Sequence, residues 1–88
     1  MMIRYAILER TPFPGEWMQA AIHRIQEAEY EIFHKVYGDA HYHQRAMRRY
    51  ALHPVLLYKW DDAQLLIAYL QKSCPYAEYK VLGFVTNK

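Results

Sequence analysis

Apolar residues near the N-terminus of the chain occupy every second position. Ile3, Tyr5 and Ile7 alternate with other residues, and this spacing predicts a first strand from Met2 to Glu9. Two prolines follow within residues 11–15, and because proline disfavours helix at and before its own position, this segment is expected to be a loop.

A helical spacing then extends over the longest periodic segment of the chain. Apolar residues recur three or four positions apart between residues 18 and 36, so a helix is predicted over residues 16–37. Gly38 is expected to end it as a left-handed cap. A second, aromatic line runs along the same helix at Tyr30, Phe33 and Tyr37. Core packing is the preferred interpretation of this line, and a partner-binding aromatic face is the alternative.

The stretch from residue 54 to residue 72 is the unit around which the chain is expected to be organised. A nearly continuous apolar run over residues 55–60 predicts a strand that is buried on both faces. Asp61 or Asp62 is expected to cap the helix that follows, and Pro75 is expected to end it. The face predicted to be buried consists of Ala63, Leu66, Ile67, Leu70 and Cys74.

Two further segments complete the secondary structure. Asp39 resembles an N-cap, which predicts a short helix over residues 40–51, although a strand or loop is the alternative for this stretch. The last strand is predicted over residues 79–86, where Gly83 marks a bulge or a close approach.

The order of these elements predicts the class of fold. Strand, helix, short helix, strand, helix and strand follow one another in a single domain, residues 1–88. Helical crossovers favour parallel neighbours, so we expect an α/β protein with a small three-stranded, largely parallel sheet and helices packed on it. A fourth strand within residues 40–50 would instead give a ferredoxin-like α+β sandwich.

Composition narrows the class of protein. The apolar runs are far shorter than the ~20 residues that span a bilayer, so no membrane association is expected. A single cysteine and an N-terminus without a signal-peptide pattern favour a cytoplasmic location. The net charge is +2, but residues 1–44 carry four Lys/Arg against six Asp/Glu, whereas residues 45–88 carry seven against three. Nine tyrosines in so small a chain indicate half-exposed aromatic positions, where interfaces are commonly built.

A basic segment is the most suggestive surface feature in the sequence. On the predicted short helix its members are His41, Tyr42, Gln44, Arg45, Arg48, Arg49 and Tyr50. Arginines flanked by tyrosines can grip phosphates and stack on a base, which is the chemistry of nucleic-acid binding. The competing interpretation is a solvated helix face that pairs with acidic residues such as Glu27 and Glu31.

No enzymatic motif stands out. Asp61 and Asp62 with the later Glu78 and Lys80 superficially resemble the carboxylate and lysine set of a metal-dependent nuclease, but a whole helix separates the two groups. The histidine spacings do not suit a zinc site, and the three glycines are too scattered for a phosphate loop, so neither a metal nor a cofactor is expected.

The sequence therefore favours a small non-enzymatic interaction module with a protein partner, acting as a regulator or inhibitor of a larger macromolecular assembly. A nucleic-acid-binding accessory protein that uses residues 41–49 is the alternative, and a nuclease is a weaker one. A homodimer is also expected, by sheet extension or through the aromatic face of the long helix. Neither terminal strand carries a proline or closely spaced charged residues that would prevent pairing at its edge.

Replacing Arg45, Arg48 and Arg49 together by glutamine tests the nucleic-acid alternative. If each arginine contacts a phosphate, the salt slope of oligonucleotide binding should fall by about one unit per lost contact. We expect the parent to bind oligonucleotides no better than non-specifically, with a Kd of about 10⁻⁴ to 10⁻⁶ M. Tight, salt-sensitive binding that the triple variant abolishes would reverse this preference.

Overall fold

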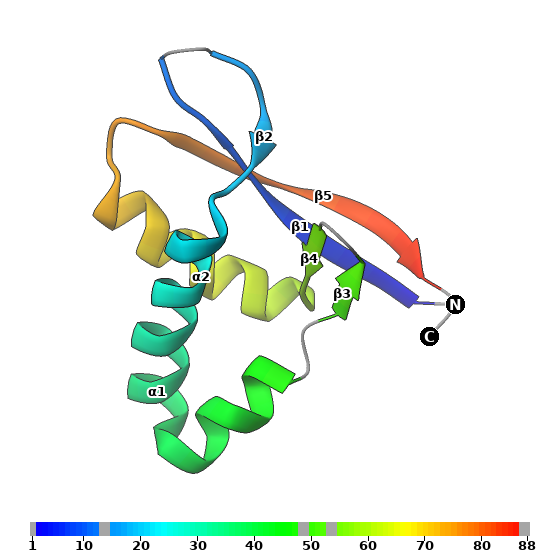
Figure 1. Cartoon of the computed structure of the whole chain (residues 1–88), viewed down its shortest axis with the longest axis vertical. Coiled ribbons are helices and arrows are strands. Elements are labelled where there is room, and N and C mark those ends of the chain that lie inside the picture. The colour runs from blue at the N-terminus through cyan, green and yellow to red at the C-terminus, as the bar shows by residue number, and fades with distance from the viewer. Residues whose placement is uncertain (1, 13–14, 48–49, 53–54, 87–88) are drawn as a thin grey trace.

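The computed structural model describes residues 2–12, 15–47, 50–52 and 55–86, and between residues 36 and 55 it describes only the backbone. The elements in chain order are β1 (Met2–Arg10), β2 (Met18–Gln19), α1 (Ile22–Met47), β3 (Tyr50–Leu52), β4 (Val55–Leu57), α2 (Trp60–Ser73) and β5 (Glu78–Thr86) (Figure 1).

The main sheet is antiparallel. Its strand order is β2-β1-β5, and β1 pairs with β5 along its whole length, from Met2 opposite Thr86 to Arg10 opposite Glu78. β2 joins the other edge of β1 beside Leu8. The predicted largely parallel sheet is therefore wrong, and the protein has an α+β fold rather than an α/β fold.

An additional reversal of the chain explains the error. β3 and β4 pair with each other antiparallel, where the sequence predicted the end of a helix and one strand. Reciprocal N–H···O hydrogen bonds of 2.8 and 2.9 Å between Tyr5 and Tyr58 then attach the end of this hairpin to β1, also antiparallel. Because the hairpin turns the chain around before α2, the last strand returns along the far edge of β1 in the opposite direction to β1.

The alternative prediction, a ferredoxin-like α+β sandwich, named the observed class but not its details. The additional strand is β3, Tyr50–Leu52, which overlaps the predicted residues 40–50 only at Tyr50. The β3–β4 pair meets β1 at a single bridge, so the four-stranded sheet of such a sandwich is divided into a three-stranded and a two-stranded part.

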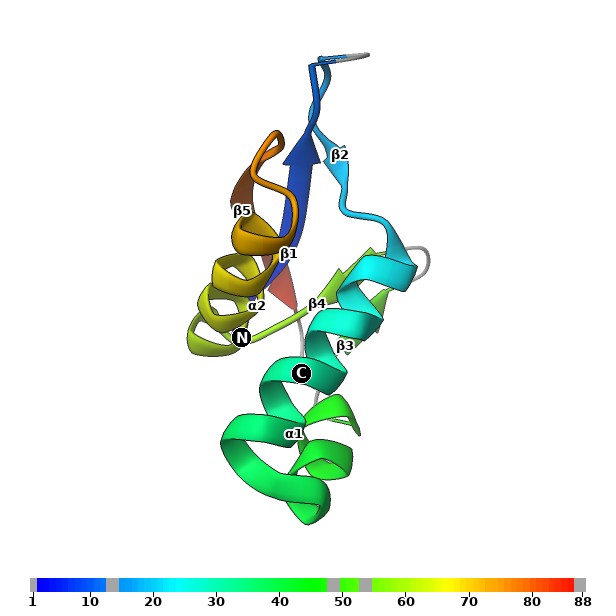
Figure 2. The ribbon, with the colours of Figure 1, turned by 90° about the vertical axis from the view of Figure 1, so that its left-hand side faces the viewer.

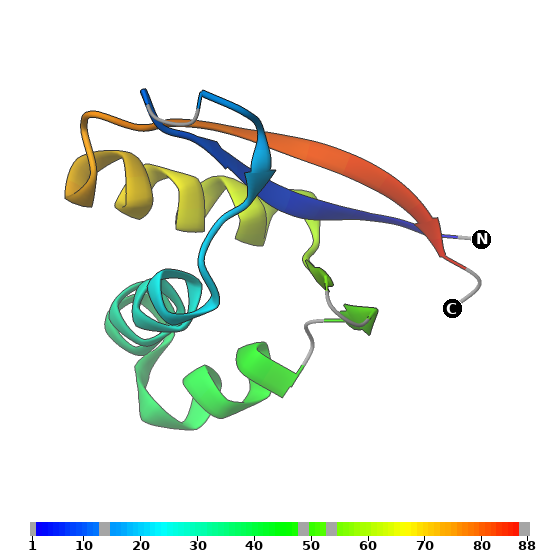
Figure 3. The same cartoon turned by 45° about the horizontal axis from the view of Figure 1, so that its top comes forward.

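Both helices lie on the same side of the main sheet, as Figure 3 shows. α2 covers β1 and β5, whereas α1 packs against α2 and lies on the side of β2 and the β3–β4 hairpin (Figure 2). Between the helices and the sheet lies a core whose buried members are Ile7, Ala20, Ile25, Ala28, Phe33, Tyr58, Ala63, Leu66 and Leu70. In the part of the chain that the structure describes, no helix lies on the other side of the sheet (Figure 3).

The long helix differs from its prediction at both ends. It begins at Ile22, and residues 18–19, predicted to be helical, form β2 instead because their backbone extends the edge of β1. α1 continues through Gly38 and Asp39 to Met47, so Gly38 does not end the helix, and the helical part of the predicted segment 40–51 is the last part of α1, which the ribbon shows turned in another direction (Figure 1). Helical periodicity alone did not reveal either boundary, since both depend on what the backbone meets outside the helix.

The remaining elements follow their predictions closely. β1 and β5 each differ from the predicted strand by one residue. α2 begins at Trp60 with Lys59 as its N-cap, so Asp61 and Asp62 do not cap the helix but lie in its first turn, where negative charge is still favourable. Gly83 lies in an unbroken ladder and marks no bulge, and a Cβ there would stand 3.5 Å from Ile3 and from the Tyr5 ring, an ordinary van der Waals distance, so the structure does not show the predicted close approach either.

Leu66→Ala tests the position of the core. Leu66 is fully buried between the helices and the sheet, so its truncation should leave a cavity and lower the free energy of unfolding by about 2–5 kcal/mol. Urea unfolding measures this loss, with Leu65→Ala, at a half-buried position of the same helix, as the control. A loss of less than about 0.5 kcal/mol for Leu66→Ala would place the buried face elsewhere.

Candidate functional site

The uncovered side of the main sheet is the candidate interaction surface. Strand alternation directs Tyr5 and Ile7 of β1 into the core, so the intervening residues of β1 and their partners on β5 point to the opposite side. We call this surface the outer sheet face; its members are Arg4, Ala6, Leu8, Arg10, Trp17, Glu78, Lys80, Leu82 and Phe84, of which only Ala6 is buried.

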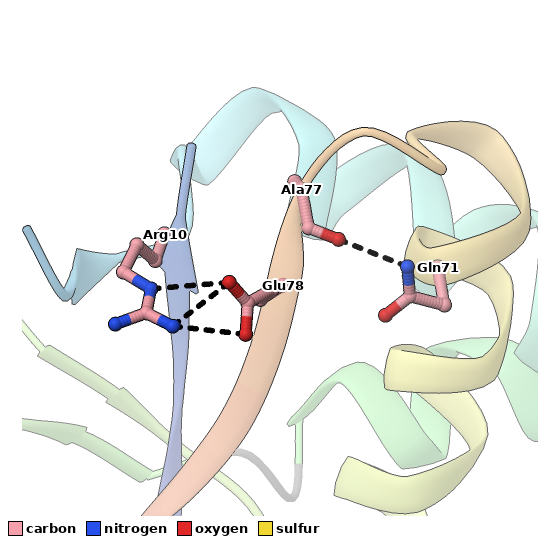
Figure 4. A network of polar contacts seen from close by, with 4 residues as sticks. All are labelled: Arg10, Gln71, Ala77 and Glu78. Carbon is pink, nitrogen blue, oxygen red and sulfur yellow. Dashed lines mark hydrogen bonds and ion pairs between the residues drawn. The ribbon is translucent and has the colours of Figure 1, made fainter. Parts of the chain in front are cut away.

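An arginine–carboxylate fork lies at one end of the outer sheet face. Arg10 on β1 donates three hydrogen bonds to Glu78 on β5, from Nε to Oε1 at 3.2 Å and from Nη2 to Oε1 and Oε2 at 2.8 and 3.0 Å (Figure 4). The Arg10 side chain is 38% exposed and that of Glu78 is 64% exposed, so water screens the pair and it contributes little to stability. Its effect on the surface is to neutralise Glu78, the one carboxylate among the residues of this face.

Trp17 lies beside the fork with two cations over its ring. The guanidinium carbon of Arg10 is 4.8 Å from the ring centroid, and Nζ of Lys80 is 4.3 Å from it. Such contacts are favourable because the face of the indole ring is electron-rich. They also draw Lys80 inward across the sheet, away from the outer edge of β5.

The rest of the outer sheet face combines unpaired positive charge with apolar area. Among the described residues, no carboxylate pairs with Arg4, whose contacts are the Ile3 carbonyl oxygen at 3.3 Å and the Met2 sulfur at 3.7 Å. Lys80 likewise has no acidic partner in the described part of the chain. Leu82 follows Lys80 on this face of β5, lies diagonally opposite Arg4 on β1, and is 47% exposed. The surface therefore suits a ligand that is both acidic and aliphatic.

A second polar cluster lies on the covered side of the sheet. Glu9 is 8% exposed, and its Oε1 accepts hydrogen bonds from Arg24 Nη1 at 2.6 Å and from the Tyr79 hydroxyl at 2.7 Å. We call these three residues the Glu9 cluster. It joins the start of α1 to both long strands.

The environment of the Glu9 cluster changes the pKa of its members. Burial raises the pKa of the Tyr79 hydroxyl above its ordinary value, and the hydrogen bonds to Glu9 and Cys74 raise it further, so that Tyr79 remains a donor. For Arg24, burial acts to lower the pKa, but attraction to Glu9 and to the nearby Cys74 and Tyr76 outweighs it, and the pKa is raised. The raised pKa of Arg24 keeps its ion pair with Glu9 charged, and the raised pKa of Tyr79 keeps its hydroxyl protonated as a hydrogen-bond donor. The cluster therefore has a structural role.

A cavity of about 280 Å³ opens beside this cluster. Its walls are formed by α1 and α2, through His23, Arg24, Glu27, Tyr69, Leu70, Ser73 and Cys74. The Tyr69 hydroxyl donates to Glu27 at 3.2 Å across it. The lining mixes both signs of charge, and Ser73, Cys74 and His23 are among its side chains. Within the described residues, no group of three His, Cys, Asp or Glu side chains is placed to hold a metal ion.

The structure separates the residues that the sequence grouped as sites. Of the aromatic line, Phe33 is fully buried in the core, Tyr30 is 51% exposed and stacks on His34 at 5.1 Å, and the side chain of Tyr37 lies outside the described residues. A partner-binding role for this line stays a prediction, and of the two described rings only Tyr30 is exposed.

The basic segment stays a prediction as well. The side chains of His41, Tyr42, Arg45 and Tyr50 lie outside the described residues, as do Arg48 and Arg49 as a whole. The nuclease-like set can be placed. Glu78 and Lys80 are on the outer sheet face, whereas Asp61 and Asp62 are in α2 on the opposite side of the sheet, so the two groups cannot share a metal ion.

Sequence reasoning missed the Glu9 cluster and the surroundings of Trp17. Glu9 lies two residues after Ile7, so it points to the same side of the strand as Tyr5 and Ile7. A carboxylate on the buried side of a strand needs a partner, and this could have predicted a buried ion pair. The fork between Arg10 and Glu78 had no such signal, because its two residues are 68 positions apart.

No protein-family model matches the chain, and comparisons with the curated proteins and with the solved structures give no significant match. Among the described residues, neither helix has the length and hydropathy needed to cross a membrane.

Tyr79→Phe tests the Glu9 cluster. At neutral pH the lost hydrogen bond to a buried carboxylate should cost about 1–2 kcal/mol. Because the pKa of Tyr79 is raised in the folded state, its contribution is complete below the ordinary pKa of about 10 and is lost as the pH rises through the folded value.

Urea unfolding at neutral pH and at several values above about pH 10 measures both effects. The difference between parent and Tyr79→Phe should shrink as the pH rises, whereas Tyr30→Phe, at an exposed ring, is the control and should change little. A difference that is independent of pH would show that Tyr79 ionises normally.

Proposed function

We propose that the protein is a small non-enzymatic interaction module that binds an acidic, partly aliphatic segment of a protein partner on its outer sheet face, and that it works as a homodimer. A module of this kind acts as a regulator or inhibitor of the assembly to which its partner belongs. It has no chemistry of its own, and its effect comes from occupying the partner's surface.

One observation carries the proposal: no element among the described residues covers the outer sheet face, and the cations of this face outnumber its available carboxylates. Arg4 and Lys80 have no acidic partner among the described residues, and Glu78 is already bound by Arg10. Leu82 follows Lys80 on this face, lies diagonally opposite Arg4, and is 47% exposed. Complementary charge would steer a partner to this face, and the apolar area would hold it after contact.

Single-stranded nucleic acid is the second candidate for the same face, because cations and aromatic rings on an open sheet suit phosphates and bases. The contacts of Trp17 favour the protein partner. Arg10 and Lys80 already lie over its ring, so a base could stack there only by displacing them. Phe84 is half-buried, which leaves Leu82 as the most exposed apolar side chain on the face.

Replacing Arg4 and Lys80 by glutamine tests this proposal. The double variant removes two charges from the outer sheet face, and Lys59→Gln with Lys72→Gln is the matched control, since it removes two exposed charges around α2. Partners are captured from nuclease-treated and untreated lysate, and the recovered protein is purified. Its affinity for each variant is then measured by calorimetry at low and high salt.

We expect the outer-face variant to bind the purified partner at least about tenfold more weakly and with a reduced salt dependence, because each exposed charge pair contributes up to about 1 kcal/mol. The control variant should bind like the parent. Equal affinities for all three proteins would exclude the outer sheet face. Capture that disappears on nuclease treatment would instead favour the nucleic-acid candidate.

A further inference from the structure

The outer edge of β5 is a complete but unused pairing surface. The N–H and C=O groups of Tyr5 point to Tyr58, so those of the neighbouring Arg4 and Ala6 point to β5. The backbone groups of their partners on β5, Phe84 and Leu82, point back to β1. The backbone groups that point away from β1, to the outer edge of β5, are therefore those of Tyr79, Val81, Gly83 and Val85. Within the described part of the chain, no strand pairs with them.

This edge lacks the features by which natural proteins protect an edge strand. It contains no proline, and its ladder with β1 runs over nine residues without a bulge. Its two charged side chains do not guard it, since Glu78 is bound to Arg10 and Lys80 lies over Trp17, both on the side of β1. Two of its apolar side chains are well exposed, Leu82 at 47% and Val85 at 64%.

β5 is also complementary to itself. Antiparallel pairing about a two-fold axis at Leu82 overlaps the entire strand and sets Leu82 opposite the partner's Leu82. Lys80 then lies opposite the partner's Phe84, and Glu78 lies opposite the partner's Thr86. A shift of two residues one way would set Glu78 opposite the partner's Phe84, and a shift of four would set Lys80 opposite the partner's Lys80. The full-overlap register is the one that pairs all nine residues of the strand, and it brings no like charges together.

The flank of α2 next to this edge is equally suited to a second copy. Tyr69 marks the flank that faces α1, through its hydrogen bond to Glu27. The opposite flank, which we call the edge flank, consists of Trp60, Gln64, Ile67 and Gln71. Gln71 donates to the carbonyl oxygen of Ala77, just before β5, at 2.9 Å, which places this flank beside the strand (Figure 4). None of its four residues carries a charge, and Trp60, whose ring lies edge-on to the Tyr5 ring of β1 at 5.1 Å, is still 50% exposed.

The distance between α2 and its copy in such a dimer is also compatible with helix packing. α2 contacts β1 and β5 alike, so its axis lies near the gap between the two strands. With strands about 4.8 Å apart, the two-fold axis would place α2 and its copy roughly two strand spacings apart. Packed helices are separated by about 8–10 Å, so the two edge flanks could meet without displacing the sheet.

We propose that a second copy of this chain pairs with β5 in the full-overlap register, joining two three-stranded sheets into one and packing the two edge flanks against each other. This inference rests on the proposed homodimer and names its surface. It also brings the two outer sheet faces together on the same side of the joined sheet. A partner with two acidic segments would then be held by both, with an affinity above that of either face alone.

Opposite charges at Leu82 test the surface. Leu82→Lys and Leu82→Glu each set like charges opposite each other at the two-fold axis, so each variant alone should dimerise at least about tenfold more weakly than the parent. Mixing the two should restore the dimer as a heterodimer at low salt. Ile22→Lys, at a position 46% exposed on α1, is the matched control and should leave the dimer intact. Sedimentation velocity gives the mass, and circular dichroism confirms that each variant folds.

Cysteine cross-linking tests the register. In a Cys74→Ser background, Leu82→Cys should form an intermolecular disulfide on oxidation, because opposing residues that do not exchange hydrogen bonds have Cα atoms about 4.5 Å apart. Val85→Cys should not, since it would lie opposite the partner's Tyr79. Efficient cross-linking of Val85→Cys instead of Leu82→Cys would overturn the register.

A parent that is monomeric at high micromolar concentration would overturn the dimer itself, as would a dimer that Ile22→Lys dissociates and the Leu82 variants do not. These experiments use the purified protein alone and measure its mass. Their failure is therefore separate from a failure of the proposed partner binding, which is measured with the Arg4 and Lys80 variants.

Discussion

The pairing of the first strand with the last is the interaction on which the rest of the structure depends. β1 and β5 form an unbroken antiparallel ladder of nine residue pairs, and the other elements attach to it directly or through a neighbouring element. β2 and the end of the β3–β4 hairpin join the free edge of β1, and α2 covers the two strands from one side. A chain of 88 residues can bury only a small core, and here that core is built on one face of this strand pair.

A sheet that is covered on only one side explains where the candidate function lies. The covered side uses its alternate residues for the core, and the other side is free to carry charge and exposed apolar groups without loss of stability. Arg4, Lys80 and Leu82 occupy such positions, and so does the outer edge of β5. Both proposed interactions, with an acidic partner and with a second copy, therefore use parts of the sheet that the fold does not need for itself.

The Glu9 cluster shows the opposite use of polar residues. A carboxylate that is 8% exposed is costly unless it is paired, and Arg24 and Tyr79 both donate to it. Their three elements, β1, α1 and β5, are thereby held in one arrangement beside the helix cavity. We interpret this cluster as a means of fixing the start of α1 against the sheet, and it accounts for the raised pKa of Tyr79 without a catalytic role.

The sequence by itself determined the elements whose signal is local. The alternation of β1, the apolar run of β5 and the buried face of α2 at Ala63, Leu66 and Leu70 are all encoded within a few neighbouring residues, and the structure confirms them. What only the tertiary structure decided depends on residues far apart in the chain. The antiparallel sheet follows from the reversal at β3 and β4, and β2 exists because β1 offers it an edge. Arg10 meets Glu78, and Arg24 meets Glu9, only once the ladder has formed. Periodicity records which side of an element is buried, but it carries no information about which other element buries it.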